Sequence, residues 1–137
     1  MYLLDTNVVS ELRKAKKADR GVRTWAQALP AASLYLCVIS ILELEIGILV
    51  VERRDRKQGG ILRAWMESHV LPSFSERILA IDAAVALRCA ALHVPNPRSD
   101  RDALIAATAL VHGMTVVTRN VSDFQVMGVA VVNPWDS

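Results

Sequence analysis

Four acidic residues, spread along the whole chain, are the side chains best suited to do chemistry. Asp5 directly follows the first apolar run, and Asp123 lies in the loop just beyond the apolar run at residues 115–118. In an open parallel sheet, ligand sites collect outside the carboxyl ends of the strands, where both of these carboxylates would lie. Glu43 and Asp102 stand near the starts of two helical stretches and could reach the same edge. We therefore predict one acidic site.

Glu43 and Asp102 also have an ordinary explanation as parts of helix caps. Ser40 precedes Glu43 by three residues, and Ser99 precedes Asp102 by three. This is the spacing of a capping box, in which a serine and an acid each bond a helix-end amide of the other. Taken alone, each pair is better explained by capping. The hypothesis of a site depends on the convergence of all four acids.

The chemistry of such a site follows from the repulsion between its carboxylates. Acids held within a few ångströms repel unless a proton or a cation compensates their charge. Arg101 and Arg119 are the nearby bases, and two arginines are too few to neutralise the group. Hard oxygen ligands with few histidines favour Mg²⁺ or Mn²⁺ over Zn²⁺. Because such ions activate water for attack on a phosphodiester, hydrolysis of nucleic acid is the predicted chemistry.

Short apolar runs alternate with helical stretches, which is typical of β-α-β units around a parallel sheet. The expected strands cover residues 2–4, 34–39, 78–81, 115–118 and 130–132. One helix is expected to begin near Thr6, and five further helices are expected over residues 22–29, 41–54, 61–69, 83–92 and 103–112. Gly59-Gly60 is expected to separate the third helix from the fourth, Pro72 to end the fourth, and Gly113 to cap the last.

The bulk composition predicts one domain over residues 1–137. A chain of 137 residues with 53% hydrophobic residues can form one core, and its net charge of +2 requires any nucleic-acid contact to be local. Glu43 and Glu45 interrupt the longest apolar stretch, and no signal peptide pattern opens the chain, so we expect a cytoplasmic protein without membrane contact. Cys37 and Cys89 stand in apolar surroundings and are expected to be buried thiols.

Four motifs occur together in the order LLDTN, ELEIG, DALIAATA and TRNVSDF. Together they resemble the PIN-domain family, specifically the VapC and FitB-like toxin ribonucleases of type II toxin–antitoxin systems, over nearly the whole chain. The resemblance implies a three-layer α/β/α fold around a short five-stranded parallel sheet. It also implies Mg²⁺- or Mn²⁺-dependent cleavage of RNA and inhibition by a cognate antitoxin protein.

The same motifs assign roles to individual residues. The residues that carry over as catalytic and metal-binding acids are Asp5, Glu43, Asp102 and Asp123. The supporting residues are Thr6, which would hydrogen-bond with Asp5, its neighbour Asn7, and Thr118, Arg119 and Asn120 at the edge of the site. Glu45 is a rival to Glu43 if the helix is rotated. Asp100 could make an outer-shell contact, although capping or solvent exposure is the more ordinary explanation.

Two surface features suggest partners. The basic segment at residues 13–23 could steer an RNA backbone toward the acids, and a solvated loop explains it equally well. The apolar stretches at residues 41–51 and 61–66 carry more hydrophobic surface than a small sheet needs, which suggests a protein interface. In the resembled family such surfaces serve dimerisation and antitoxin binding. We therefore expect a homodimer that joins antitoxins into a larger assembly.

Two alternatives compete with the nuclease hypothesis. Phosphoryl-transfer proteins of the receiver or haloacid-dehalogenase type also place an aspartate after the first strand, where it acts as a nucleophile. The dehalogenase motif needs a second acid two residues on, and here Asn7 occupies that position. The other alternative is a catalytically degenerate PIN-fold module that only holds a partner protein. The presence of all four acids argues against it.

Overall fold

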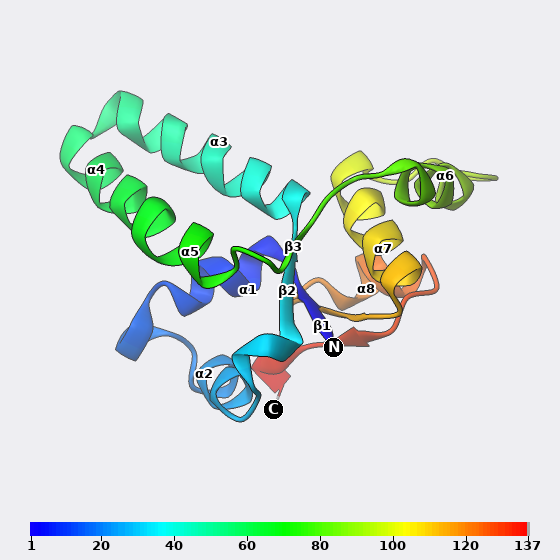
Figure 1. The fold of residues 1–137 in the computed structure, drawn as a ribbon, viewed down its shortest axis with the longest axis horizontal. Helices are drawn as coiled ribbons and strands as arrows, with labels where there is room; N and C mark the ends of the chain where they lie inside the picture. Colours follow the sequence, from blue (N-terminus) through cyan, green and yellow to red (C-terminus); the bar gives the residue numbers. More distant parts are fainter. Residues whose placement is uncertain (137) are drawn as a thin grey trace.

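The computed structural model describes residues 1–136 and places helices on both faces of one parallel sheet (Figure 1). Its strands are β1 (Tyr2–Leu4), β2 (Leu34–Cys37), β3 (Ile78–Leu79), β4 (Thr115–Val117) and β5 (Val131–Val132). They are ordered β3-β2-β1-β4-β5, and every neighbouring pair is parallel. The three-layer fold with five parallel strands is thus confirmed. Ser137, the last residue of the expected domain, lies outside the described residues.

Helices make up most of the rest of the chain. They are α1 (Thr6–Leu12), α2 (Arg20–Gln27), α3 (Val38–Arg54), α4 (Arg56–Trp65), α5 (Leu71–Ser73), α6 (Ala83–Leu92), α7 (Asp100–His112) and α8 (Val121–Gln125). A π-helical segment, η3 (Met66–Val70), joins α4 to α5, and the 3-10 turns are η1 (Ala15–Lys17), η2 (Ala31–Ser33) and η4 (Pro134–Asp136). As expected, α7 ends at Gly113, whose φ of +66° suits a residue without a Cβ.

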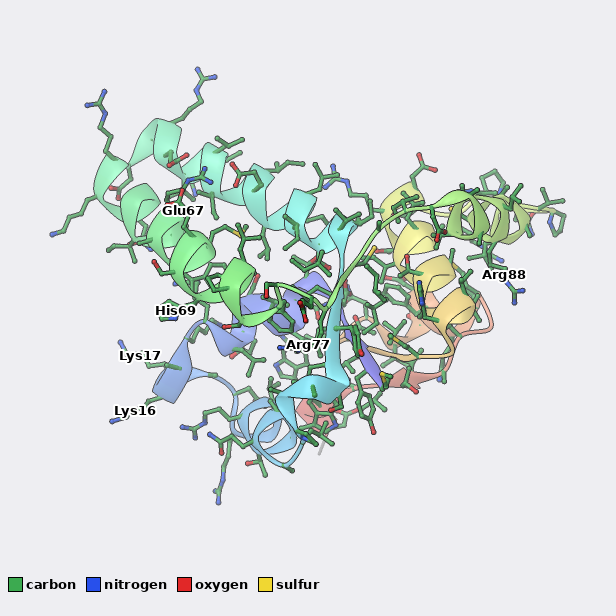
Figure 2. All side chains as sticks on the ribbon, in the orientation of Figure 1. Lys16, Lys17, Glu67, His69, Arg77 and Arg88 are labelled. Carbon is green, nitrogen blue, oxygen red and sulfur yellow. The ribbon has the colours of Figure 1, made fainter. Side chains whose placement is uncertain are left out.

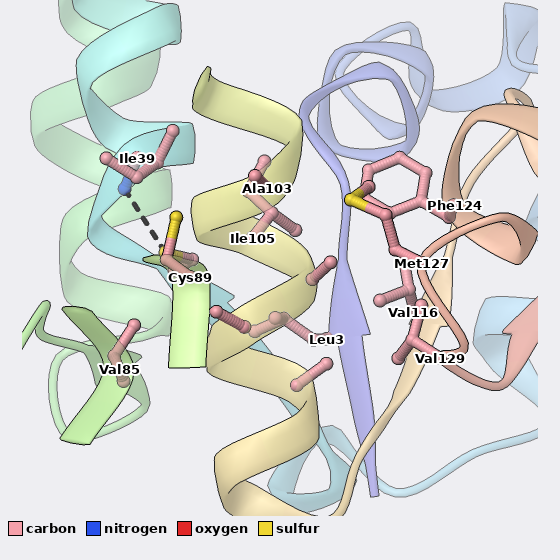
Figure 3. Close-up of a cluster of buried hydrophobic side chains, with 14 of the residues drawn as sticks. Leu3, Ile39, Val85, Cys89, Ala103, Ile105, Val116, Phe124, Met127 and Val129 are labelled. Atoms are coloured by element: carbon pink, nitrogen blue, oxygen red, sulfur yellow. Dashed lines mark hydrogen bonds between the residues drawn. The ribbon is translucent and has the colours of Figure 1, made fainter. Parts of the chain in front are cut away.

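The alternation of side chains along the short strands builds two cores. Leu3 and Val116 point to one face, where they meet α7 and Phe124 of α8 (Figure 3). Leu4 and Val117 point to the other face and pack with residues of α1, α2, α3 and η3. All four of these strand side chains are fully buried. Because both faces are covered, only the strand ends remain open to a ligand.

The central position of β1 fixes where the acids meet. Leu4 lies opposite Val117 in the β1–β4 register, so the residues that follow, Asp5 and Thr118, leave the sheet side by side. The amide of Asp5 donates to the carbonyl of Val117 at 2.9 Å. The carboxyl edge of the sheet is therefore where the first motif and the last motif come together.

Several predicted boundaries were wrong around the hairpin formed by α3 and α4. The second strand ends at Cys37 and α3 begins at Val38, three residues before the expected start. Gly59-Gly60 does not break the helix: the break is at Asp55, whose φ of −152° is extended and whose carboxylate caps α4 through the Gln58 amide at 3.1 Å. The boundary between α3 and α4 is therefore set by an aspartate N-cap and not by the two glycines.

Pro72 also behaves differently from the prediction. The helical path continues beyond Trp65 through η3 into α5, and Pro72 lies in the first turn of α5. The proline therefore does not end the helical path, and the π-helical segment η3 lies directly before it. The cysteine prediction is confirmed, since Cys37 and Cys89 are both buried and free. Within residues 1–136, no helix is long and apolar enough to cross a membrane.

Candidate active site

Asp5 lies at the point where β1 becomes α1, and it is the N-cap of that helix. Its Oδ1 accepts the Thr6 amide at 2.8 Å, and its Oδ2 accepts the Thr118 hydroxyl at 2.7 Å. The side chain amide of Asn7 lies 3.4 Å from the same Oδ2. Only 5% of Asp5 is exposed. The carboxylate is thus fixed by neutral donors at the edge of the sheet.

The loop after β4 is tied to this aspartate through Thr118. The Thr118 hydroxyl donates to Asp5 and accepts the Asn120 amide at 3.0 Å. The amide of Arg119 donates to Asn7 Oδ1 at 3.4 Å. The predicted supporting residues therefore form one network that joins the start of α1 to the loop before α8.

Glu43 is held near Asp5 by the residue that follows Asp5. The Thr6 hydroxyl donates to Glu43 Oε1 at 2.7 Å, and it also lies 3.1 Å from the hydroxyl of Ser40. Ser40 is fully buried inside α3, which is capped by the Cys37 sulfur, so the capping-box explanation for Ser40 and Glu43 was wrong. Glu43 therefore faces the cleft, where Thr6 holds its carboxylate.

Asp102 lies in the first turn of α7, as expected for the residue before ALIAATA. Ser99 is the N-cap but makes no side-chain capping bond, so this second capping box is also absent. Burial raises the pKa of Asp102, and the charges of Asp123 and then Glu43 raise it further. Asp123 is exposed on α8 and acts on Asp102 through its charge.

A cleft with a volume of about 510 Å³ brings these groups together. It is lined by Asp5, Thr6, Asn7, Ser10, Glu11, Arg13, Lys14, Glu43, Asp102, Arg119, Asn120 and Trp135. Three of the four predicted acids face it, whereas Asp123 is outside its lining. Three cationic side chains share the cleft with the acids: Arg13, Lys14 and Arg119.

Only the first part of the basic segment reaches this cleft. Arg13 and Lys14 line it, while Lys16 and Lys17 project from η1 into solvent (Figure 2). Ser10 and Glu11 also line the cleft and were not predicted, although they follow Thr6 and Asn7 by four residues and so share one face of α1. Trp135 was not predicted either, because no local pattern relates the end of the chain to α1.

Glu45, the predicted rival of Glu43, and Asp100, the possible outer-shell residue, lie elsewhere. The Glu45 carboxylate accepts two hydrogen bonds from Arg63 of α4, at 2.6 and 2.8 Å. Asp100 has a side chain that is 91% exposed and lies 3.6 Å from His93, outside the cleft lining. The ambiguity between Glu43 and Glu45 is thus resolved by orientation: Glu43 faces the cleft, and Glu45 faces the α3–α4 hairpin.

The electrostatics of the cleft make Asp5 unusual. Burial raises its pKa from 3.8 to about 6, and the charges of Asp102 and Glu43 add to the rise. The hydrogen bonds from Thr118 and Thr6 oppose this shift without cancelling it. Arg101 approaches Glu43 only at 3.7 Å and is half exposed, so it offers weak compensation. A strongly shifted carboxyl group in a cleft is typical of a functional site.

The residues of the cleft fit a hard divalent cation by their chemistry. The acidic side chains that line it offer carboxylate oxygens, and the charges of Asp102 and Glu43 add to the burial that raises the pKa of Asp5. A bound cation would offset those charges. Within residues 1–136, no three acidic, thiol or imidazole side chains converge closely enough to enclose an ion. The fit therefore rests on the chemistry of the donor atoms alone.

Comparisons with known proteins give the family. The PIN domain model matches residues 2–128. The chain is 37% identical to the VapC ribonuclease Y4jK of Sinorhizobium fredii, over 99% of each protein, and 36% identical to toxin FitB of Neisseria gonorrhoeae, over 98% of this chain and 99% of the toxin. The crystal structure of FitAcB from N. gonorrhoeae matches with a TM-score of 0.91 and 34% identity over the whole of both chains. The chain belongs to the PIN domain family.

Proposed function

We propose that this protein is a Mg²⁺- or Mn²⁺-dependent endoribonuclease and the toxin of a toxin–antitoxin pair. The observation that carries the proposal is the cleft, in which the carboxylates of Asp5, Glu43 and Asp102 stand beside cationic side chains. Acids can hold a cation, and bases can hold phosphates. A relative with 37% identity over 99% of both chains is named a ribonuclease, which supports RNA as the substrate.

The chain's own residues have distinct tasks in this proposal. Asp5 is held rigidly by Thr118 and the Thr6 amide, while the Thr6 hydroxyl orients Glu43. These fixed carboxylates would hold the cation in the cleft. When bound, the cation supplies an activated water for attack on phosphorus and stabilises the charge of the leaving oxygen.

The cationic side chains of the cleft keep the RNA backbone next to the acids. Arg13, Lys14 and Arg119 are exposed and line the cleft, so they can contact phosphates without burying their charges. These three side chains form a local basic patch, as RNA binding would require in a chain whose net charge is only +2. The binding of RNA should weaken as salt is added, because contacts with phosphates release counterions.

The partner we propose is a cognate antitoxin protein. Structures similar to this chain include FitAcB and a complex titled FitAB bound to a DNA fragment, with TM-scores of 0.91 and 0.89 and identities of 34% and 36%. The outer side of α3 is apolar and exposed, at Leu42, Ile46, Leu49 and Val50. Such a face favours a protein interface. We propose a cytoplasmic homodimer that joins antitoxins into a larger assembly, and light scattering that finds monomers both free and in complex would contradict this.

A cleavage assay tests the enzymatic proposal. The protein, freed of any co-purifying partner, is incubated with total cellular RNA and Mg²⁺ or Mn²⁺, beside an EDTA control. We expect discrete RNA fragments from the wild type with metal, and none from Asp5→Asn. Asp102→Asn should also be inactive. Asp100→Asn is its matched control, because the same change two residues away alters an exposed acid outside the cleft.

The same assay separates the proposal from its alternative. If the wild type and Asp5→Asn are equally silent with every metal and RNA, the chain is a degenerate module that holds a partner. If both are equally active, the cleavage comes from a contaminant. Cleavage by Asp100→Asn but not by Asp102→Asn would assign the activity to this cleft.

A further inference from the structure

The last turn of the described chain brings an aromatic ring into the cleft. Trp135 belongs to η4, which lies beyond residues 2–128 matched by the family model, yet it lines the same cleft as Asp5. The guanidinium carbon of Arg119 lies over its indole, 5.1 Å from the ring centroid. This contact joins the two chain segments that follow β4 and β5.

Both members of this pair are held in place by their backbones. The Trp135 amide donates to Asn133 Oδ1 at 3.0 Å, and the indole packs partly against the core beneath the sheet. The Arg119 amide donates to Asn7 Oδ1 at 3.4 Å, and its neighbour Thr118 is bonded to Asp5. Arg119 is therefore positioned relative to the acids before any ligand arrives, which lowers the entropic cost of binding.

The two faces of the Arg119 guanidinium have different surroundings. The indole of Trp135 lies on one side, with the guanidinium carbon over the ring. Arg119 is nevertheless exposed and lines the cleft, so its planar group remains accessible to a ligand. Planar guanidinium groups stack on nucleobases as aromatic rings do, and unpaired bases of RNA are commonly recognised in this way.

We propose that Arg119 and Trp135 form a stacking subsite for one unpaired base of the RNA, next to the phosphate held at the acidic end of the cleft. This inference rests on the proposed ribonuclease function and deepens it. The subsite makes the enzyme favour single-stranded RNA, because a paired base presents no free face to the guanidinium. It adds affinity that depends on the base and not on the charge of the strand.

A binding experiment without cleavage tests the subsite. The parent protein is Asp5→Asn in EDTA, which removes a repelling charge and the reaction together. The probes are an oligoadenylate of roughly eight nucleotides and a wholly abasic strand of equal length and charge. Fluorescence anisotropy gives the preference for the strand with bases. We expect Arg119→Lys and Trp135→Leu to reduce that preference by about 10-fold, and Trp135→Phe to restore part of it.

Matched variants separate stacking from charge and from misfolding. Arg119→Lys keeps the positive charge and changes an exposed side chain, so its salt dependence should equal that of the parent. Arg13→Lys, the same change at a second arginine of the cleft, should leave the preference for bases intact. Thermal melting checks that each variant is folded. If Trp135→Leu unfolds, Arg119→Lys alone still decides.

The outcomes distinguish this inference from the proposed function. An unchanged preference in Arg119→Lys overturns the subsite and leaves the nuclease intact. Failure of the parent to bind either strand also overturns the subsite, and the cleavage assay then decides separately whether the chain is a nuclease. A lower preference for bases in both Arg119→Lys and Trp135→Leu, with Arg13→Lys unaffected, supports it.

Discussion

Carboxylates on the α3–α4 hairpin and carboxylates in the cleft meet opposite electrostatic surroundings. On the hairpin, Arg63 donates to Glu45 at 2.6 and 2.8 Å and to Glu52 at 3.0 and 3.3 Å. In the cleft, Asp5 accepts its shortest hydrogen bonds from an amide and a hydroxyl, neither of which carries charge. The arginine lowers the pKa of Glu45, whereas burial raises the pKa of Asp5 to about 6.

This difference shows how a functional acid can be told from a structural one. On the hairpin, Glu45 and Glu52 of α3 join that helix to α4, because Arg63 of α4 compensates their charges. In the cleft, Asp5 is buried among neutral donors and near the charges of Asp102 and Glu43, so its ionised form costs stability unless a cation compensates. The comparison therefore supports the proposal that a cation and RNA bind in the cleft.

The largest expected effect separates Glu43 from Glu45. Glu43→Gln should lower RNA cleavage by about 100-fold or more, because it removes a charge that faces the cleft. Glu45→Gln makes the same change two residues along α3, where the partner is Arg63, and should leave cleavage unchanged. Initial rates at saturating Mg²⁺ measure both. Equal losses in the two variants would show that the hairpin, and not the orientation of Glu43, controls activity.

The next effect concerns the stability of the metal-free protein. Because the pKa of Asp5 is raised by folding from 3.8 to about 6, its contribution to stability is fully present below pH 3.8 and is lost as the pH rises through 6. The shift corresponds to about 3 kcal/mol at most. Asp5→Asn does not titrate, so it should be more stable than the wild type at pH 8 and similar to it near pH 4.

Urea unfolding in EDTA at the two pH values measures this difference. Asn resembles the protonated carboxyl group in shape and donor capacity, so it is the appropriate substitution. Adding Mg²⁺ at pH 8 should then stabilise the wild type more than Asp5→Asn, since the ion compensates a charge that only the wild type has. A wild type that gains stability from pH 4 to pH 8 relative to Asp5→Asn would contradict the raised pKa.

Substitutions at two neighbouring glycines test how closely α3 and α4 must pack for Arg63 to reach Glu45 and Glu52. A Cβ on Gly59 would lie 2.6 Å from the Cα of Glu52, whereas one on Gly60 would have no neighbour within 4 Å. Gly59→Ala should therefore destabilise the fold by about 1–3 kcal/mol. Gly60→Ala should stabilise it by about 0.5–1 kcal/mol, because alanine favours a helix. Chemical denaturation compares them, and equal effects would argue against close contact at Gly59.

These glycines also show where sequence reasoning fails. The alternation of strands and helices, and the position of Asp5 after the first strand, could be read from local patterns of apolar residues. The break at Asp55 was missed because Gly59 and Gly60 looked like the stronger helix breakers. Gly59 is there for close packing against Glu52, a contact that appears only after the hairpin has folded.

The site was predictable as far as its acids follow motifs. Ser40 was misassigned because its spacing from Glu43 matches a capping box, while the helix in fact starts at Val38 and buries Ser40 beneath Thr6. Trp135 could not be placed beside Arg119, since the contact depends on the neighbouring positions of β4 and β5 in the sheet. The burial of Ser40 and the contact between Trp135 and Arg119 both depend on long-range packing, which local sequence patterns do not reveal.

The smallest expected effect comes from the ion pairs of the hairpin. Arg63→Met keeps an unbranched apolar stem and removes the charge that answers Glu45 and Glu52. These side chains are partly exposed, so solvent screens much of the interaction, and only a small fall in melting temperature is expected. High salt should reduce the difference in melting temperature between the variant and the wild type, because it screens the ion pairs that only the wild type makes.

Cleavage at low temperature should not change in Arg63→Met, since the acids of the cleft depend on Thr6 and Thr118 for their positions. A large loss of activity in Arg63→Met, with the fold intact, would mean that the two groups of carboxylates are coupled through α3.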